Sequence, residues 1–182
     1  MTLANMLTVF RMAVIPFFVM SLVLGNPRTA VWLFLVAGFT DLLDGAIARF
    51  FNQKTALGAF LDPMADKLIL TSTYVVLAIP ALGLDHPIPI WLPVLTISRD
   101  VVIVLLALVL NMTFSIKNFP PSLPGKLTTF VQISYAVAVL LQNGYGFRDD
   151  VTLALMWGVA FFTIFSGLHY IWRMRLLVRG QA

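Results

Sequence analysis

Four aspartates lie between positions 41 and 66 of a chain that is otherwise strongly apolar. They form two pairs, one spaced by three residues and one by four: Asp41 and Asp44, then Asp62 and Asp66. Residues three or four apart lie on one face of an α-helix, so each pair would present its carboxylates in one direction. Carboxylate oxygens are ligands that Mg²⁺ and Mn²⁺ prefer, and two such ions can stabilise a displacement at phosphorus. The aspartates therefore predict a divalent-cation site that acts on a phosphate ester, with one aspartate available as a general base.

Charge balance favours bound cations over a simpler alternative, in which the aspartates cap helices or form structural ion pairs. Carboxylates in an apolar environment cannot all be ionised unless positive charge lies among them. The basic residues nearest in sequence, Arg49 and Lys67, bring two positive charges against four negative ones. Divalent cations would supply the charge that is missing.

Small residues accompany the aspartates. Gly45 and Ala48 keep the face of the first aspartate pair free of bulk, and Gly58 lies one helical turn before the second pair. Such residues permit either close helix packing or close approach of a ligand, and both interpretations stay open. Arg49, at the end of the same segment as the first pair, suits a diphosphate.

The composition indicates that these residues lie in a membrane protein. Of the 182 residues, 60% are hydrophobic and 11% are charged, and the mean hydropathy is +0.94. A soluble domain is about half apolar and about a quarter charged, so the lipid bilayer is the expected solvent. The absence of cysteine excludes disulfides and thiolate metal sites. The net charge of +4 comes from scattered basic residues, which favours anionic lipid head groups as partners and no nucleic acid.

Six apolar segments are long enough to cross a bilayer as helices, which takes about 20 residues each. They cover residues 7–24, 30–50, 57–80, 89–112, 124–142 and 151–174. Four of the five breaks between them contain proline or glycine, the break at 52–55 reads "NQKT", and the connections are short. The sequence therefore predicts an all-α integral membrane protein, a bundle of six transmembrane helices that forms one domain over residues 1–182.

Basic residues near the segment ends predict the orientation in the membrane. If the N-terminus is cytoplasmic, only Arg28 and Arg148 lie at ends on the opposite side. The cytoplasmic ends then hold Arg49, Lys54, Lys117, Lys126, Arg173, Arg175 and Arg179. Both termini and the aspartate site are therefore expected on the cytoplasmic side of the cell inner membrane or its equivalent.

The aspartates and small residues together spell a known signature. The pattern Asp-x2-Asp-Gly-x2-Ala-Arg-x8-Gly-x3-Asp-x3-Asp is complete from Asp41 to Asp66. The chain therefore resembles the CDP-alcohol phosphotransferase family, and the likeness extends to "NMLTVFRMAVIP", "ISRD" and "GKLTTFVQ". This resemblance implies a six-helix, usually homodimeric membrane enzyme that uses two Mg²⁺ or Mn²⁺ ions.

The resemblance also implies a role for each residue of the signature. The metal ligands would be Asp41, Asp44, Asp62 and Asp66. The CDP pocket would be lined by Gly45, Ala48, Arg49 and Gly58. Asp66 would also deprotonate the acceptor hydroxyl, whose oxygen attacks the β-phosphorus of CDP-diacylglycerol so that CMP leaves.

The acceptor is expected to be of the glycerol type. The chain is most similar to phosphatidylglycerophosphate synthases, which use glycerol-3-phosphate, and to CMP-forming cardiolipin synthases, which use phosphatidylglycerol. Two basic residues usual in the first group are replaced here by Ala107 and Thr128, which leaves Arg99 and Lys126 as acceptor-binding candidates. A phosphomonoester needs a larger basic cluster. Since the Arg99–Asp100 pair also resembles the cardiolipin synthase pattern, phosphatidylglycerol is favoured and glycerol-3-phosphate is the alternative.

Both acceptor-binding candidates also have simpler interpretations. Arg99 could form an ion pair with Asp100, and Lys126 could be a basic anchor at the cytoplasmic membrane surface.

Two other classes of protein fit the sequence less well. Intramembrane prenyltransferases also use aspartate clusters with Mg²⁺, but they need more than six spans and lack the spacing of Gly45, Ala48, Arg49 and Gly58. A divalent-cation transporter often has repeated halves with matching broken helices. Here the four acids lie only in the second and third apolar segments.

Overall fold

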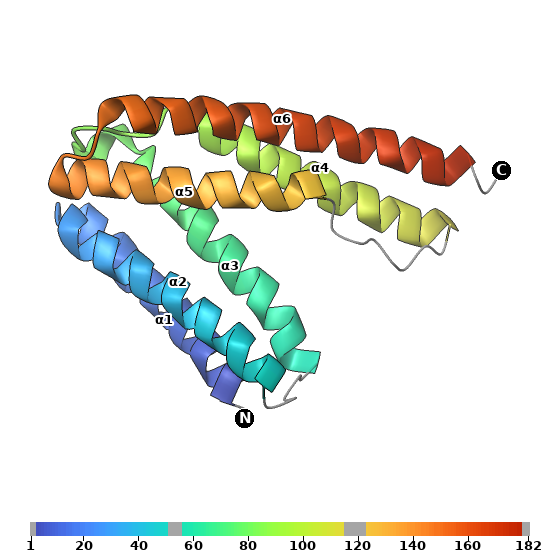
Figure 1. Ribbon diagram of the computed structural model, residues 1–182, viewed down its shortest axis with the longest axis horizontal. Coiled ribbons are helices and arrows are strands. Elements are labelled where there is room, and N and C mark those ends of the chain that lie inside the picture. Colours follow the sequence, from blue (N-terminus) through green and yellow to red (C-terminus); the bar gives the residue numbers. More distant parts are fainter. Residues whose placement is uncertain (1–2, 51–55, 115–122, 180–182) are drawn as a thin grey trace. The chain divides into compact units, whose positions relative to one another are not determined.

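The computed structural model describes residues 3–50, 56–114 and 123–179, which form six α-helices, one short 3₁₀ turn and no strand (Figure 1). The helices are α1 (Leu3–Val23), α2 (Pro27–Phe50), α3 (Ala56–Leu77), α4 (Trp91–Phe114), α5 (Leu123–Tyr145) and α6 (Asp149–Arg179), with η1 (Pro80–Leu82) between α3 and α4. Each helix coincides with one predicted apolar segment. The all-α class and the positions of the helices are therefore confirmed.

Glycines in the left-handed backbone conformation end two of these helices. Gly25 follows α1 with φ of 72°, and its amide donates to the carbonyl of Leu22. Gly146 follows α5 with φ of 70° and donates to the carbonyl of Gln142. A residue with a Cβ rarely adopts this conformation, so glycine fixes where each helix stops. Proline at the first position of α2 then starts the next helix at once.

The chain divides into two compact units. The first contains the described residues of Met1–Ile88 and Ala136–Arg148, and within it α1 packs against both α2 and α3. One face of α1, with residues spaced three or four apart, is buried: Thr8, Arg11, Val14, Phe18 and Leu22. The ring of Phe18 lies 5.9 Å from that of Phe34 in α2. Hydrophobic burial along this stripe therefore fixes α1 against its two neighbours.

The described buried face of α2 leads to the first aspartate. Ala30, Phe34 and Ala37 are buried, and Asp41 follows at the same helical spacing. In α3, Asp66 likewise shares a face with the buried residues Thr73 and Leu77. The packing of the three helices thus turns both aspartates toward the same region.

At its other end, α2 is fixed by the last residues of α5. The Nε of Arg28 donates to the carbonyl of Gly144 at 2.9 Å, and the indole nitrogen of Trp32 donates to the hydroxyl of Tyr145 at 3.1 Å. A side chain on Gly144 would come within 3.5 Å of the Arg28 backbone. Gly144 therefore lies in van der Waals contact with the start of α2.

The second unit contains the described residues of Pro89–Tyr135 and Asp149–Ala182. Within it α4 packs against α6, and the rings of Trp91 and Trp157 lie 6.1 Å apart. The expectation of one domain over residues 1–182 stays a prediction.

Among the described residues, three helices are long and apolar enough to cross a membrane: Met6–Val23, Leu123–Tyr145 and Asp149–Arg175. Many large apolar side chains are exposed on the helices, including Phe17, Trp32, Phe39, Phe161 and Leu168. Such a surface suits contact with lipid. The count of six spans stays a prediction.

Candidate active site

The signature residues lie on two helices, as the spacing predicts. Helix α2 carries Asp41, Asp44, Gly45, Ala48 and Arg49, and α3 carries Gly58, Asp62 and Asp66. The side chains of Asp41 and Asp66 are described. Those of Asp44, Ala48, Arg49 and Asp62 lie outside the described part of the structure, as do the surroundings of Gly45 and Gly58.

The first and last aspartates of the signature converge on one arginine. The Nη1 atom of Arg11 lies 2.6 Å from Oδ1 of Asp41 and 2.5 Å from Oδ1 of Asp66. One nitrogen atom therefore contacts carboxylates from two different helices. Arg11 and Asp66 are 55 residues apart in the sequence. One described aspartate from α2 and one from α3 therefore meet at the same place.

Burial differs sharply between the arginine and its two partners. The side chain of Arg11 is 1% exposed, whereas those of Asp41 and Asp66 are 40% and 53% exposed. Arg11 thus reaches the carboxylates from within the packed helices, and each aspartate side chain stays partly exposed. A substrate or a cation can approach the acids from that outer side.

Sequence reasoning missed Arg11 because it weighed only the basic residues close to the aspartates in the chain. The signal was present: Arg11 is the only charged residue of α1, and it lies in the stripe of residues that packs inward. Membrane helices rarely keep an isolated charge without a partner. Part of the negative charge is therefore balanced by a structural ion pair, as the simpler alternative anticipated.

The described carboxylates fit a hard divalent cation. Both are oxygen donors, they come from two different helices, and their shared contact with Nη1 of Arg11 keeps them close enough to approach one ion. No group of three or more metal-binding side chains occurs among the described residues, a set from which the side chains of Asp44 and Asp62 are missing. The donor chemistry agrees with Mg²⁺ or Mn²⁺.

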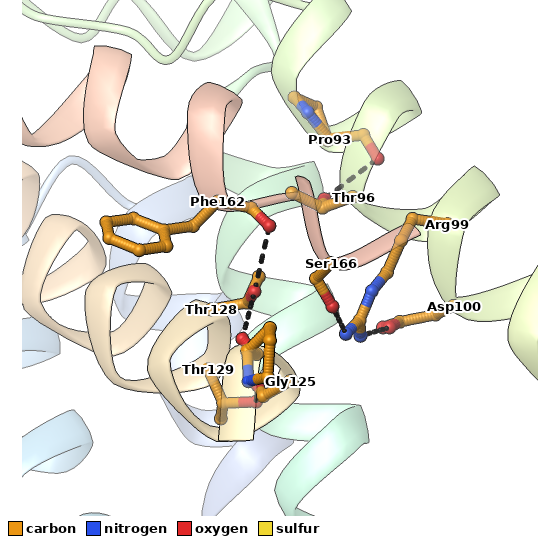
Figure 2. Close-up of polar contacts among 10 residues, drawn as sticks. Pro93, Thr96, Arg99, Asp100, Gly125, Thr128, Thr129, Phe162 and Ser166 are labelled. Atoms are coloured by element: carbon orange, nitrogen blue, oxygen red, sulfur yellow. Dashed lines mark hydrogen bonds and ion pairs between the residues drawn. The ribbon is translucent and has the colours of Figure 1, made fainter. Parts of the chain in front are cut away.

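The second unit holds a partly buried polar cluster around Arg99 in α4 (Figure 2). Its Nη1 donates to Oδ1 of Asp100 at 2.8 Å, and its Nη2 donates to the hydroxyl of Ser166 in α6. Ser166 is fully buried, and a side chain on Gly167 would lie 3.7 Å from Cγ of Arg99. The ion pair with Asp100 agrees with the simpler interpretation of Arg99, and Ser166 is a partner that the sequence did not reveal.

Lys126 lies in the first turn of α5 and is exposed. No hydrogen bond or ion pair joins it to Arg99 in the part of the chain that the structure describes. The start of α5 is instead fixed by Thr128, whose hydroxyl lies 2.8 Å from the carbonyl of Pro124 and 3.0 Å from that of Phe162 (Figure 2). Ala107 has no described side chain.

Replacing Ser166 with alanine is expected to lower stability by about 1 kcal/mol, because Arg99 would lose a buried hydrogen-bond acceptor. Thermal unfolding in detergent measures the change. Ser134→Ala is the matched control, since the Ser134 hydroxyl only donates to the carbonyl of Phe130 in its own helix. Equal unfolding temperatures for the two variants would contradict a stabilising contact between α4 and α6.

Comparison with known proteins identifies the family. The family model for CDP-alcohol phosphatidyltransferases matches residues 1–165, and the chain belongs to this family. It is 32% identical to human cardiolipin synthase (CMP-forming) over 93% of this chain and 61% of that protein. It is 32% identical to the Haemophilus influenzae CDP-diacylglycerol–glycerol-3-phosphate 3-phosphatidyltransferase over 91% of this chain and 89% of that protein. The expected resemblance is confirmed, and the protein is an integral membrane protein of a transferase family.

The relatives carry the names of both expected activities. Cardiolipin synthase (CMP-forming) of Streptomyces coelicolor is 30% identical over all of this chain and 86% of that protein. The chain spans 61% and 65% of the human and rat cardiolipin synthases. Similar identities to both groups leave the acceptor to be argued from the residues of the site.

Proposed function

We propose that this protein transfers the phosphatidyl group of CDP-diacylglycerol to a glycerol-type acceptor and releases CMP. The observation that carries the proposal is the convergence of Asp41 and Asp66, from two helices, with their side chains partly exposed. The family match and the names of the relatives support the same chemistry.

In this proposal four aspartates hold the divalent cations: Asp41, Asp44, Asp62 and Asp66. Bound Mg²⁺ or Mn²⁺ would offset the charge of the diphosphate and stabilise the leaving oxygen. The residues Gly45, Ala48, Arg49 and Gly58 line the CDP pocket. There the small residues leave room for the nucleotide and the guanidinium of Arg49 binds the diphosphate.

Asp66 is the general base. Its side chain is 53% exposed, so an acceptor hydroxyl can approach it from outside the helix bundle. Asp66 takes the proton of that hydroxyl, and the acceptor oxygen forms a bond to the β-phosphorus of CDP-diacylglycerol. The bond from this phosphorus to the bridging oxygen breaks, and CMP leaves with the electron pair.

Phosphatidylglycerol is the proposed acceptor. One guanidinium nitrogen of Arg99 already pairs with Asp100, which reduces the positive charge that Arg99 offers to a ligand. Lys126 adds one further basic side chain, so the acceptor region suits a phosphodiester with one negative charge. Glycerol-3-phosphate is the alternative, favoured by relatives that are named for its use.

The proposal includes the arrangement of the protein in the membrane. Six helices cross the bilayer, with both termini and the active site on the cytoplasmic side, and two chains form a homodimer. The basic residues at the cytoplasmic helix ends support this orientation. A cytoplasmic site would also receive and release the nucleotide directly.

Release of CMP tests the activity and the acceptor together. Purified protein with CDP-diacylglycerol and Mg²⁺ is expected to release CMP at least about tenfold faster with phosphatidylglycerol than with glycerol-3-phosphate. Faster release with glycerol-3-phosphate would establish the alternative acceptor. No CMP with either acceptor, nor with inositol phosphate or serine, would overturn the proposed function.

A further inference from the structure

Arg11 occupies the position where the two described acids of the signature meet. It is the only charged residue of α1, it is 1% exposed, and a single nitrogen atom contacts Asp41 and Asp66 at 2.6 and 2.5 Å. A buried guanidinium is unfavourable unless its charge is matched. Here its partners are the first and last carboxylates of the proposed metal site.

Packing leaves Arg11 little freedom to move away. Its helix face also carries Thr8, Val14 and Phe18, all of them buried. The aromatic contact between Phe18 and Phe34 fixes α1 against the helix that carries Asp41. The guanidinium is therefore held in place by the fold, whereas the acids that it contacts are about half exposed.

We propose that Arg11 is a positioning residue that fixes the carboxylates of Asp41 and Asp66 and lowers the affinity of the site for divalent cations. The inference rests on the proposed function, because it concerns the metal site of that reaction. A fixed carboxylate on Asp66 keeps the base oriented toward the acceptor hydroxyl, which raises the rate of the chemical step.

Removal of Arg11 is expected to change the affinity for divalent cations and the reaction rate in opposite directions. An aspartate side chain has only two torsion angles, so little conformational entropy is lost when a metal orders it. Fixing the side chain in advance through Arg11 therefore adds little to metal affinity. A full positive charge within 2.6 Å of both carboxylates opposes a bound cation much more strongly. Removal of the charge should therefore tighten metal binding while the reaction slows.

The test uses the full chain purified in detergent and Mn²⁺ as the probe. The electron paramagnetic resonance signal of free Mn²⁺ measures binding, and CMP release from CDP-diacylglycerol with the active acceptor measures the rate. For Arg11→Gln we expect Mn²⁺ to bind about tenfold more tightly. We also expect kcat to fall about 100-fold, with a smaller change in KM for CDP-diacylglycerol.

Two further variants separate charge from fold. Arg11→Lys keeps the charge but not the planar guanidinium, so Mn²⁺ affinity should stay within about twofold while kcat falls about tenfold. Arg28→Gln removes an arginine near the other end of α2, about 20 Å along the helix from Asp41. This control should leave both Mn²⁺ affinity and CMP release within about twofold of the unmodified protein.

The outcomes distinguish the two proposals. If the unmodified protein neither binds Mn²⁺ nor releases CMP, the proposed function fails. If it does both, but folded Arg11→Gln binds Mn²⁺ with equal or lower affinity, the inference about Arg11 is overturned. If Arg11→Gln does not fold, Arg11→Lys decides: full kcat would overturn the positioning role, and a reduced kcat at unchanged Mn²⁺ affinity would support it.

Discussion

Replacement of Asp66 with asparagine is expected to slow CMP release by about a thousandfold. The amide has nearly the same shape as the carboxylate, but it cannot accept the proton of the acceptor hydroxyl. It is also a weaker ligand for Mg²⁺ or Mn²⁺, because it carries no negative charge. The side chain of Asp66 is 53% exposed, so its replacement leaves little buried volume unfilled.

The fold of this variant should be preserved. The amide oxygen of asparagine can still accept a hydrogen bond from Arg11, which keeps its ion pair with Asp41. Thermal unfolding in detergent should therefore change little. Asp85→Asn is the matched control, since Asp85 is an exposed residue of the connection between α3 and α4. If Asp66→Asn released CMP within about tenfold of the control, Asp66 would not be the general base.

The helices of this protein could be predicted from its sequence because apolar length and helix breaks are local signals. About 20 apolar residues are needed to cross a bilayer, and proline or glycine ends most of these runs. Gly25 and Gly146 illustrate the second point, because each occupies a left-handed conformation within two residues of the end of a helix. The helical spacing of the aspartates is equally local, and it predicted the helices that carry Asp41 and Asp66.

The partners of the charged residues could not be predicted in the same way. Arg11 and Asp66 are 55 residues apart in the chain, and Arg99 and Ser166 are 67 apart. Which helix faces pack together decides these contacts, and periodicity alone does not select the neighbours of a helix. The pair of Arg99 and Asp100 was foreseen as an alternative because those residues are adjacent.

Arg11 also changes how the aspartate cluster is understood. With only Arg49 and Lys67 nearby in the sequence, the four acids implied that divalent cations supply the missing positive charge. The structure supplies one fixed positive charge to two of the acids and leaves both partly exposed. In the proposed metal site, this arrangement would hold the two carboxylates in place before a cation binds, and the remaining negative charge of the four aspartates would still attract the cation.

Removal of divalent cations is expected to reduce CMP release to background, and addition of Mg²⁺ or Mn²⁺ should restore it. The described carboxylates are negatively charged oxygen donors from two helices, and they repel the negative charge of a diphosphate. A divalent cation of high charge density is needed to bind both groups at once. Ca²⁺ should restore much less activity, because its bonds to oxygen are about 2.3–2.6 Å long compared with about 2.0–2.1 Å for Mg²⁺.

Thermal unfolding gives a second measure of cation binding at the aspartates. A cation that binds only the folded protein stabilises it by about 2.7 kcal/mol at 100 times its dissociation constant. Mg²⁺ should therefore raise the unfolding temperature of the unmodified protein, and Asp41→Asn should reduce this rise because it removes one charged ligand. Asp85→Asn should retain the full rise. Undiminished CMP release in excess chelator, together with an unfolding temperature that Mg²⁺ does not change, would show that the aspartates serve the reaction without a metal.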